Sequence, residues 1–104
     1  MNNRLRQIAG LDRLIHEPAR LMIVAALYVV KEADFLYLQD QTGLTKGNLS
    51  SHLEKLEEAG YVDIEKTYRG KIPMTVCRLT KKGQEAFKIY EIALRAIFTE
   101  PVKE

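Results

Sequence analysis

One stretch decides the fold of this chain, Gly43-Leu44-Thr45-Lys46-Gly47-Asn48-Leu49-Ser50-Ser51-His52-Leu53-Glu54-Lys55-Leu56-Glu57-Glu58-Ala59-Gly60. Its leucines at 49, 53 and 56 recur at helical spacing and predict a helix of about residues 45–59 with one buried stripe. Thr45 is a suitable N-cap, and Gly60 suits the left-handed residue that ends a helix. Gly43 makes the tight turn that precedes this helix.

Upstream of Gly43 the pattern predicts further helices. Asp34 can cap a short helix from Phe35 to about Thr42. Pro18 begins a helix of about residues 18–31 that is apolar nearly all round, so it should be buried on more than one side. Apolar residues at helical spacing also predict an N-terminal helix of about residues 1–16, which Gly10 weakens.

Downstream of Gly60 the period changes to two, which is typical of strands. Val62 and Ile64 begin a strand to Tyr68, residues 69–71 form a turn, and Ile72–Leu79 is the returning strand. Pro73 lacks a backbone donor, so it belongs at an edge. Thr80 can cap a last helix to about Phe98. We therefore expect a single α+β domain over residues 1–104, a winged helix-turn-helix with a small antiparallel hairpin of two or three strands and extra terminal helices.

Composition narrows the class of protein. A chain of 104 residues has room for one domain, and its single cysteine, Cys77, excludes an internal disulfide and a cysteine-based zinc site. The longest apolar run, residues 21–30, is far shorter than the ~20 residues that span a bilayer, and no secretory signal is seen. A cytoplasmic protein without metal or cofactor is the default expectation. His16, His52 and Cys77 fall in different predicted elements, so no catalytic set is apparent and we expect no enzyme.

Charge is distributed unevenly along the chain, although the net charge is only +2. The segment from Lys66 to Gln84 holds no acidic residue, and its basic residues are Lys66, Arg69, Lys71, Arg78, Lys81 and Lys82. The hairpin is therefore locally electropositive. Its tip, with Tyr68, Arg69 and Lys71, could lie on a DNA backbone or enter a minor groove, where Arg responds to groove width.

The helix of about residues 45–59 carries the polar groups that a DNA-reading helix needs. Asn48, Ser51 and Lys55 share one outward stripe, and Asn can pair with adenine through two hydrogen bonds. Gly47 would let the helix start approach DNA closely, while Glu54 and Glu58 must lie away from phosphates. The predicted DNA-binding residues are Thr45, Lys46, Gly47, Asn48, Ser50, Ser51, His52, Lys55, Tyr68, Arg69 and Lys71. For His52, at the edge of the leucine stripe, packing and phosphate contact are both open.

Two separated motifs resemble a known family. Phe35-Leu36-Tyr37-Leu38 with the run from Gly43 to Val62, and the later Arg78-Leu79-Thr80-Lys81-Lys82-Gly83, resemble winged-helix DNA-binding regulators related to the MarR and ArsR families. The run Thr45–Leu53 is most similar to a small single-domain subgroup. The resemblance covers roughly residues 15–98 and implies a homodimer, held by the terminal helices (about 1–16 and about 81–98), that binds a pseudo-palindromic duplex DNA operator. ArsR-type metal sensing is not implied, because the cysteine-rich signature is absent.

The apolar surface of the terminal helices exceeds what so small a domain can cover, so it needs a partner. The predicted dimer residues are Leu5, Ile8, Phe87, Tyr90, Leu94, Ile97 and Phe98. Phe87 and Tyr90 could instead line a small-molecule pocket, although packing explains them more simply, and no residue pattern supports an effector. The operator, the target genes, the sign of regulation and the helix that dominates the dimer contact stay open.

We predict a sequence-specific transcription regulator. Its recognition helix, about residues 45–59, would enter the major groove, and its wing, about residues 66–73, would touch the backbone or minor groove. The alternative is a winged-helix protein-interaction module in a larger assembly, which the acid-free wing disfavours. A ligand- or redox-responsive sensor is a weaker alternative, because Cys77 should be a small buried hydrophobe.

Overall fold

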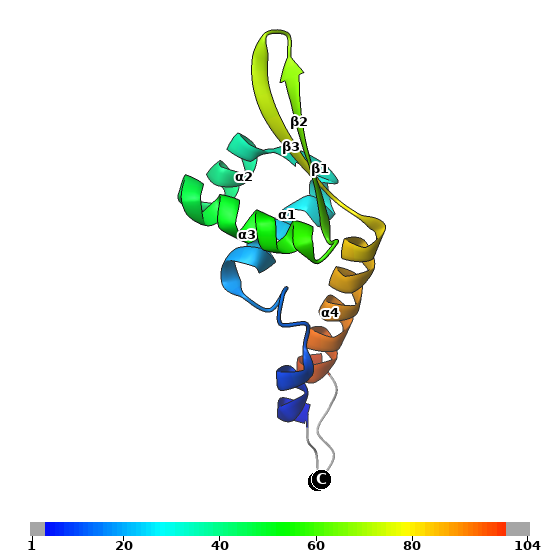
Figure 1. Cartoon of the computed structure of the whole chain (residues 1–104). Coiled ribbons are helices and arrows are strands. Elements are labelled where there is room, and N and C mark those ends of the chain that lie inside the picture. Colours follow the sequence, from blue (N-terminus) through cyan, green and yellow to red (C-terminus); the bar gives the residue numbers. More distant parts are fainter. Residues whose placement is uncertain (1–3, 100–104) are drawn as a thin grey trace.

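The chain folds as a helix-turn-helix and a β-hairpin packed together, with a long last helix along one side (Figure 1). The computed structural model describes residues 4–99. The elements are η1 (Arg4–Gly10, a 3-10 helix), α1 (Pro18–Val30), β1 (Glu32–Asp34), α2 (Phe35–Thr42), α3 (Lys46–Glu58), β2 (Val62–Arg69), β3 (Ile72–Leu79) and α4 (Lys81–Thr99). The predicted α+β winged helix-turn-helix class is confirmed.

The helix-turn-helix forms because each of its ends is satisfied by a nearby side chain or turn. The Asp34 carboxylate accepts from the Tyr37 amide at 2.7 Å and starts α2. Gly43, at φ +70, closes α2 with its amide on the Gln39 carbonyl at 2.9 Å. The Thr45 hydroxyl accepts from the Asn48 amide at 3.1 Å and starts α3. The predicted caps therefore determine where α2 ends and α3 begins.

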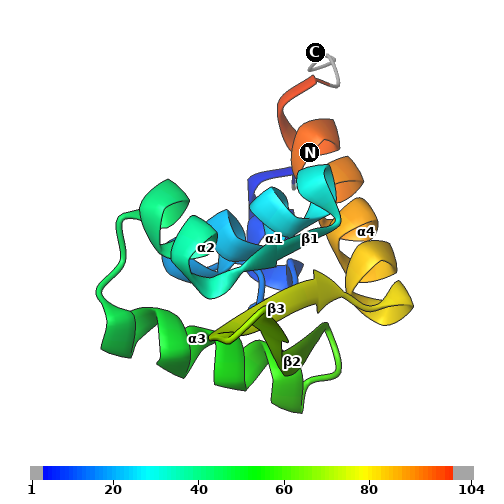
Figure 2. The same cartoon turned by 90° about the horizontal axis from the view of Figure 1, so that it is seen from above.

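The main core lies between α1, α2, α3 and the base of the sheet. The predicted stripe of α3 is buried, and it packs with apolar residues of α1, α2, β2 and β3, namely Ile23, Val24, Leu27, Leu38, Leu49, Leu53, Leu56, Val62, Cys77 and Leu79. Viewed from above in Figure 2, the hairpin lies between α3 and the start of α4. Because α3 is anchored along its whole inner side, its outer side is held in one orientation.

The sheet is three-stranded and antiparallel, in the order β1-β3-β2. β1 pairs with β3 from Glu32↔Arg78 to Asp34↔Val76, and β2 pairs with β3 along the whole hairpin. Since β1 pairs with β3 only as far as Val76, the edge of β3 at Pro73 is free. Proline has no amide hydrogen, so its place at this edge removes no hydrogen bond between strands. The outer part of the hairpin stands clear of the body as the wing (Figure 1).

The N-terminal segment differs from the predicted helix of about residues 1–16. It holds a 3-10 helix that ends at Gly10, and residues 1–3 lie outside the described part of the chain. Asp12 then accepts from the amides of Leu14 at 2.9 Å and Ile15 at 3.3 Å. These local bonds compete with continued helix and fold the chain into turns before Pro18.

A second, smaller core joins this N-terminal segment to α4. Leu11, Ile15 and Tyr90 are buried together, and Ile8 packs against them. The Tyr61 hydroxyl donates to the Asp12 carboxylate at 2.5 Å, while the His16 Nδ1 lies 2.7 Å from the Tyr90 hydroxyl. The segment before α1 is thus attached to the hairpin base and to α4, and it covers one side of the last helix.

Candidate nucleic-acid interface

The outward side of α3 carries the polar stripe that the sequence predicts. Asn48, Ser51 and Lys55 are exposed, as are Thr45, Lys46, Gly47 and Ser50 around the helix start. A Cβ built on Gly47 would meet no heavy atom within 4 Å, so internal packing does not demand glycine there. The first half of α3 therefore offers an amide, hydroxyls and an ammonium group on a rigid support, next to the positive end of the helix dipole.

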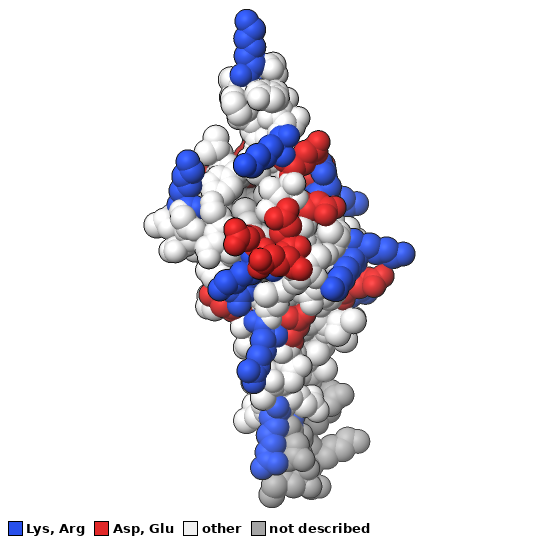
Figure 3. Space-filling model, in the orientation of Figure 1, with Lys and Arg blue, Asp and Glu red and all other residues white. Residues whose placement is uncertain are grey.

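The wing places its cations at the far end of the hairpin. Tyr68, Arg69 and Lys71 are all exposed, and the tip is seen as a blue projection in Figure 3. Gly70 has φ +64 and Lys71 has no positive φ, which matches the type II′ turn preferred in two-residue hairpin loops. Among the described residues neither Arg69 nor Lys71 forms an ion pair. Their charge is therefore available to an anionic partner.

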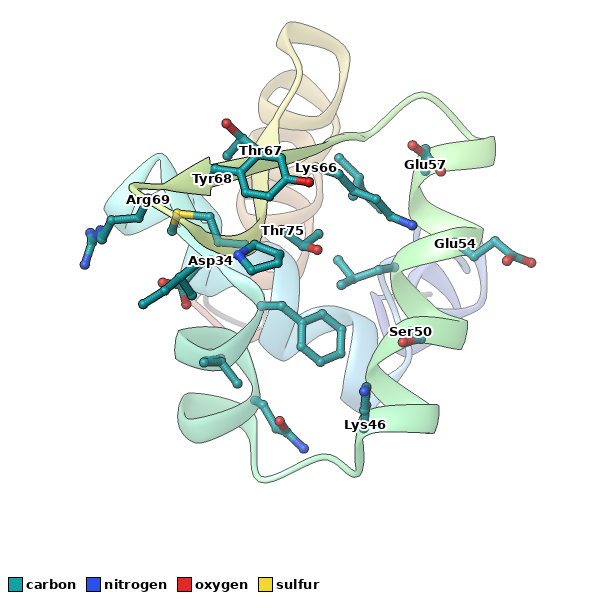
Figure 4. Close-up of a pocket in the computed structure, with 18 residues that line it drawn as sticks. Asp34, Lys46, Ser50, Glu54, Glu57, Lys66, Thr67, Tyr68, Arg69 and Thr75 are labelled. Atoms are coloured by element: carbon teal, nitrogen blue, oxygen red, sulfur yellow. The ribbon is translucent and has the colours of Figure 1, made fainter.

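A cleft of about 1100 Å³ joins these two surfaces. Its walls are the side of α3 with Lys46, Ser50, Glu54 and Glu57, the wing, and the first turns of α2 (Figure 4). Lys66 of β2 points across the cleft toward α3. Lys66 belongs to the predicted basic segment but was not among the predicted DNA-binding residues. Side chains alternate along β2, so Lys66 lies on the same side of the strand as Ile64 and Tyr68, toward α3.

Acidic residues occupy the second half of α3. Glu54, Glu57 and Glu58 are exposed, and Figure 3 shows acidic side chains gathered in the middle of the molecule. Phosphates would be repelled there and attracted to the first half of α3 and the wing tip. The charge pattern therefore limits how a polyanion can lie on this face.

His52 does not share the outward stripe. Its side chain is 20% exposed, and its Nδ1 lies 3.1 Å from an Arg20 guanidinium nitrogen and 3.9 Å from the Glu17 carboxylate. Because arginine only donates, this Nδ1 must accept, which places the ring proton on Nε2. The Arg20 Nε donates in turn to the Leu14 carbonyl at 2.6 Å. His52 thus ties α3 to the start of α1, and a phosphate contact by its exposed part stays a prediction.

Glu17 completes this junction as the cap of α1. Its carboxylate accepts from the Arg20 amide at 2.8 Å. Burial alone would raise the pKa of this carboxyl, but hydrogen bonds from the Arg20 and Ala19 amides and the positive charge of Arg20 outweigh it, so the pKa lies below its ordinary value. The junction therefore favours a charged Glu17.

The residues predicted for a dimer contact divide into two groups. Tyr90 and Ile97 are 3% and 2% exposed, and Tyr90 is buried together with Leu11 and Ile15 in the second core. Burial within this chain leaves both residues little surface for a partner, although Tyr90 also lines an apolar groove with Phe87 and Leu94. Their part in a dimer contact stays a prediction. Leu5 and Phe98 are largely exposed, while Ile8, Phe87 and Leu94 are half-buried.

An apolar groove of about 430 Å³ runs between α1 and α4. Leu21, Phe87, Leu94 and Phe98 line it, and the Phe87 ring packs on Tyr28 with centroids 4.8 Å apart. The sequence does not point to Leu21, because α1 is apolar on nearly every side and its pattern does not reveal which residues stay uncovered.

Cys77 is enclosed in the main core. Burial, followed by the nearby charges of Glu57 and Asp34, raises the pKa of its thiol to about 11. A thiol with this pKa is protonated at neutral pH and is a poor nucleophile, which argues against redox sensing through Cys77. Within residues 4–99, no cluster of three potential metal ligands occurs, and no helix has the length and apolar character needed to cross a bilayer.

Comparison with known proteins finds winged-helix relatives that match nearly the whole chain. The winged helix DNA-binding domain family matches residues 19–98. The uncharacterised protein MJ0432 of Methanocaldococcus jannaschii is 41% identical over 83 residues, which cover 77% of this chain and 89% of that protein. The transcriptional regulator homologue from Pyrococcus horikoshii OT3 superposes with a TM-score of 0.83 at 32% identity, over 92% of this chain and 94% of the other. The transcriptional repressor BigR from Xylella fastidiosa superposes with a TM-score of 0.61 at 30% identity, over 94% of this chain and 93% of the other.

Proposed function

Because the chain belongs to the winged-helix DNA-binding family of transcription regulators, and is no enzyme, we propose that it acts as a homodimer on a pseudo-palindromic operator. The observation that carries this proposal is the exposed polar stripe of α3, fixed from behind by Leu49, Leu53 and Leu56 and flanked by a cationic wing. Such a regulator would work in the cytoplasm, on chromosomal DNA.

In the proposed complex the first half of α3 enters the major groove, which is about 12 Å wide. Asn48 and Ser51 contact base edges, and Lys55 lies one turn further along the same stripe. Lys46, Ser50 and the Thr45 end of the helix contact phosphates. Gly47 lets the start of α3 approach the DNA closely, since it has no side chain between its backbone and the groove.

The wing extends the contact to the neighbouring part of the duplex. Arg69 and Lys71 supply charge at the tip, with Tyr68 beside them. Each phosphate that they neutralise releases counterions, so affinity should fall steeply with salt. Phosphate contacts supply register and affinity, whereas base-edge readout comes from the α3 stripe.

For the dimer, we propose the groove between α1 and α4 as the contact between two copies. Leu21, Leu94 and Phe98 would be covered by the partner chain, and the exposed Leu5 of η1 is proposed as a further contact. This arrangement leaves α3 and the wing of each copy free. A two-fold axis through the contact would then present two α3 helices to two half-sites.

The test is selection of bound duplexes from a random pool, followed by measurement of single-base preferences with the Asn48→Ala variant. We expect the wild type to select a two-fold symmetric sequence, and Asn48→Ala to lose about 1–3 kcal/mol of discrimination at one base pair in each half-site. Gln84→Ala, which removes an exposed amide from α4, is the matched control and should retain full selectivity. Absence of any salt-sensitive duplex binding would refute the proposal and favour the protein-interaction module.

A further inference from the structure

The tip of the wing is apolar as well as cationic. Tyr68 and Ile72 are 69% and 68% exposed, and Pro73 is exposed beside them. Within the described residues none of the three belongs to either apolar core. All three line the open cleft and stay exposed there, so the cores of this chain do not account for the apolar surface at the end of its most protruding element.

Strand register places these side chains in pairs. Arg69 pairs with Ile72, and Tyr68 pairs with Pro73. Cross-strand partners share a face of the hairpin, so one face of the tip presents a guanidinium beside a branched aliphatic group. The other face, which continues through Lys66 and Ile64, presents a phenol ring beside proline.

The charge around the tip selects the kind of partner. No acidic residue occurs between Lys66 and Gln84, so Arg69 and Lys71 meet no opposing charge from their own segment. An apolar protein partner would not require this excess of cations, whereas a nucleic acid offers phosphates at the rim of a groove and apolar base faces inside it. The minor groove is about 6 Å wide, so a two-residue tip can enter only by its outermost side chains.

We propose that Ile72, supported by Arg69, is a wedge that enters the minor groove, partly unstacks one base step and bends the duplex. This inference rests on the proposed function, because it requires the wing to lie on DNA. Apolar side chains that open a base step in this way kink DNA by about 20–90°, and the bend brings more of the backbone toward the protein. Pyrimidine–purine steps such as TA unstack most easily, so the wedge also contributes selectivity without a base-edge hydrogen bond.

The bend is measured by energy transfer between dyes at the two ends of a 30-base-pair duplex that carries the selected sequence. Ile72→Thr keeps the β-branch that suits a strand but replaces the apolar end with a hydroxyl, so the hairpin should persist. We expect the wild type to shorten the end-to-end distance and Ile72→Thr to lose most of that change. Ile89→Thr is the matched control, since Ile89 is 69% exposed on α4, outside the wing.

A second measurement compares affinity for two duplexes that differ only in whether a TA step lies at the wing position. The wedge predicts a preference of about tenfold for the deformable step, reduced to about twofold in Ile72→Thr. Wild-type binding without bending, or equal bending by both proteins, would overturn the wedge while leaving the regulator proposal intact. Failure of the wild type to bind any duplex would overturn both.

Discussion

Replacing Gly83 by alanine sets two opposing effects against each other. Gly83 lies in the first turn of α4, where the helix crosses the backbone of Tyr61. Replacing glycine by alanine within a helix usually stabilises the folded state by about 0.5–1 kcal/mol. A Cβ at this position, however, would lie 2.2 Å from the Tyr61 carbonyl oxygen and 3.0 Å from its carbonyl carbon.

The steric effect should dominate. The new contact must lengthen to at least 3.0 Å, so the start of α4 has to move by about 0.8 Å away from the hairpin base. Such overpacking costs about 1–3 kcal/mol. The same carbonyl accepts from the Thr80 amide at 3.0 Å, a bond worth about 1 kcal/mol that the shift would weaken. We therefore expect a net destabilisation of about 1–3 kcal/mol despite the gain in helix propensity.

The assay is urea unfolding at fixed protein concentration, because the stability of a dimer depends on concentration. Gly47→Ala is the matched control: it also lies in the first turn of a helix, but its Cβ would point into open space. It should stabilise the fold by up to about 1 kcal/mol while weakening DNA binding. A Gly83→Ala protein as stable as the wild type would refute the argument from close approach.

Three further predictions follow from charge. Among duplexes with the same base step at the wing position, Arg69→Ala should weaken binding to all alike and reduce the slope of log affinity against log salt by about 0.9 per copy, as read from a titration series. Cys77 should resist iodoacetamide at pH 7.5 in the native protein and react once urea unfolds it, because its thiol pKa is raised to about 11. Glu17 has a lowered pKa in the folded protein, so its contribution to stability is present above the ordinary value of 4.5 and is lost as pH falls through the folded value. Glu17→Gln should therefore flatten the acidic part of a plot of unfolding free energy against pH. An unchanged plot would exclude the Glu17 junction as the cause of that pH dependence.

Local signals in the sequence predict much of the fold. Asp34, Gly43 and Thr45 form the caps and turn that their types favour, and the leucine stripe of α3 is buried as its spacing indicates. These features depend on interactions within a few residues, or on a period that is visible in one element. The hairpin is similar, because alternation and Gly70 determine where the chain turns.

Features that depend on contacts distant in sequence were not predictable. β1 has only three residues and exists because it pairs with β3 more than forty positions later. His52 lies toward α1 because its Nδ1 contacts Arg20 and Glu17, which are more than thirty positions earlier in the chain. Tyr90 and Phe98 are both large aromatic residues of α4, but only the path of the N-terminal segment, which places Leu11 and Ile15 with Tyr90, decides that Tyr90 is buried.

The distribution of charge suggests how a duplex could lie on this protein. Placed along the whole of α3, a duplex would bring its phosphates over Glu54 and Glu58, where repulsion opposes binding. Placed over the first half of α3, it would meet Lys46, the polar stripe and the positive end of the helix dipole. From there a backbone strand can cross the cleft on the Ser50 side and reach the cationic wing tip. We therefore expect the acidic half of α3 to set the docking angle, by excluding the other placements rather than by any contact of its own.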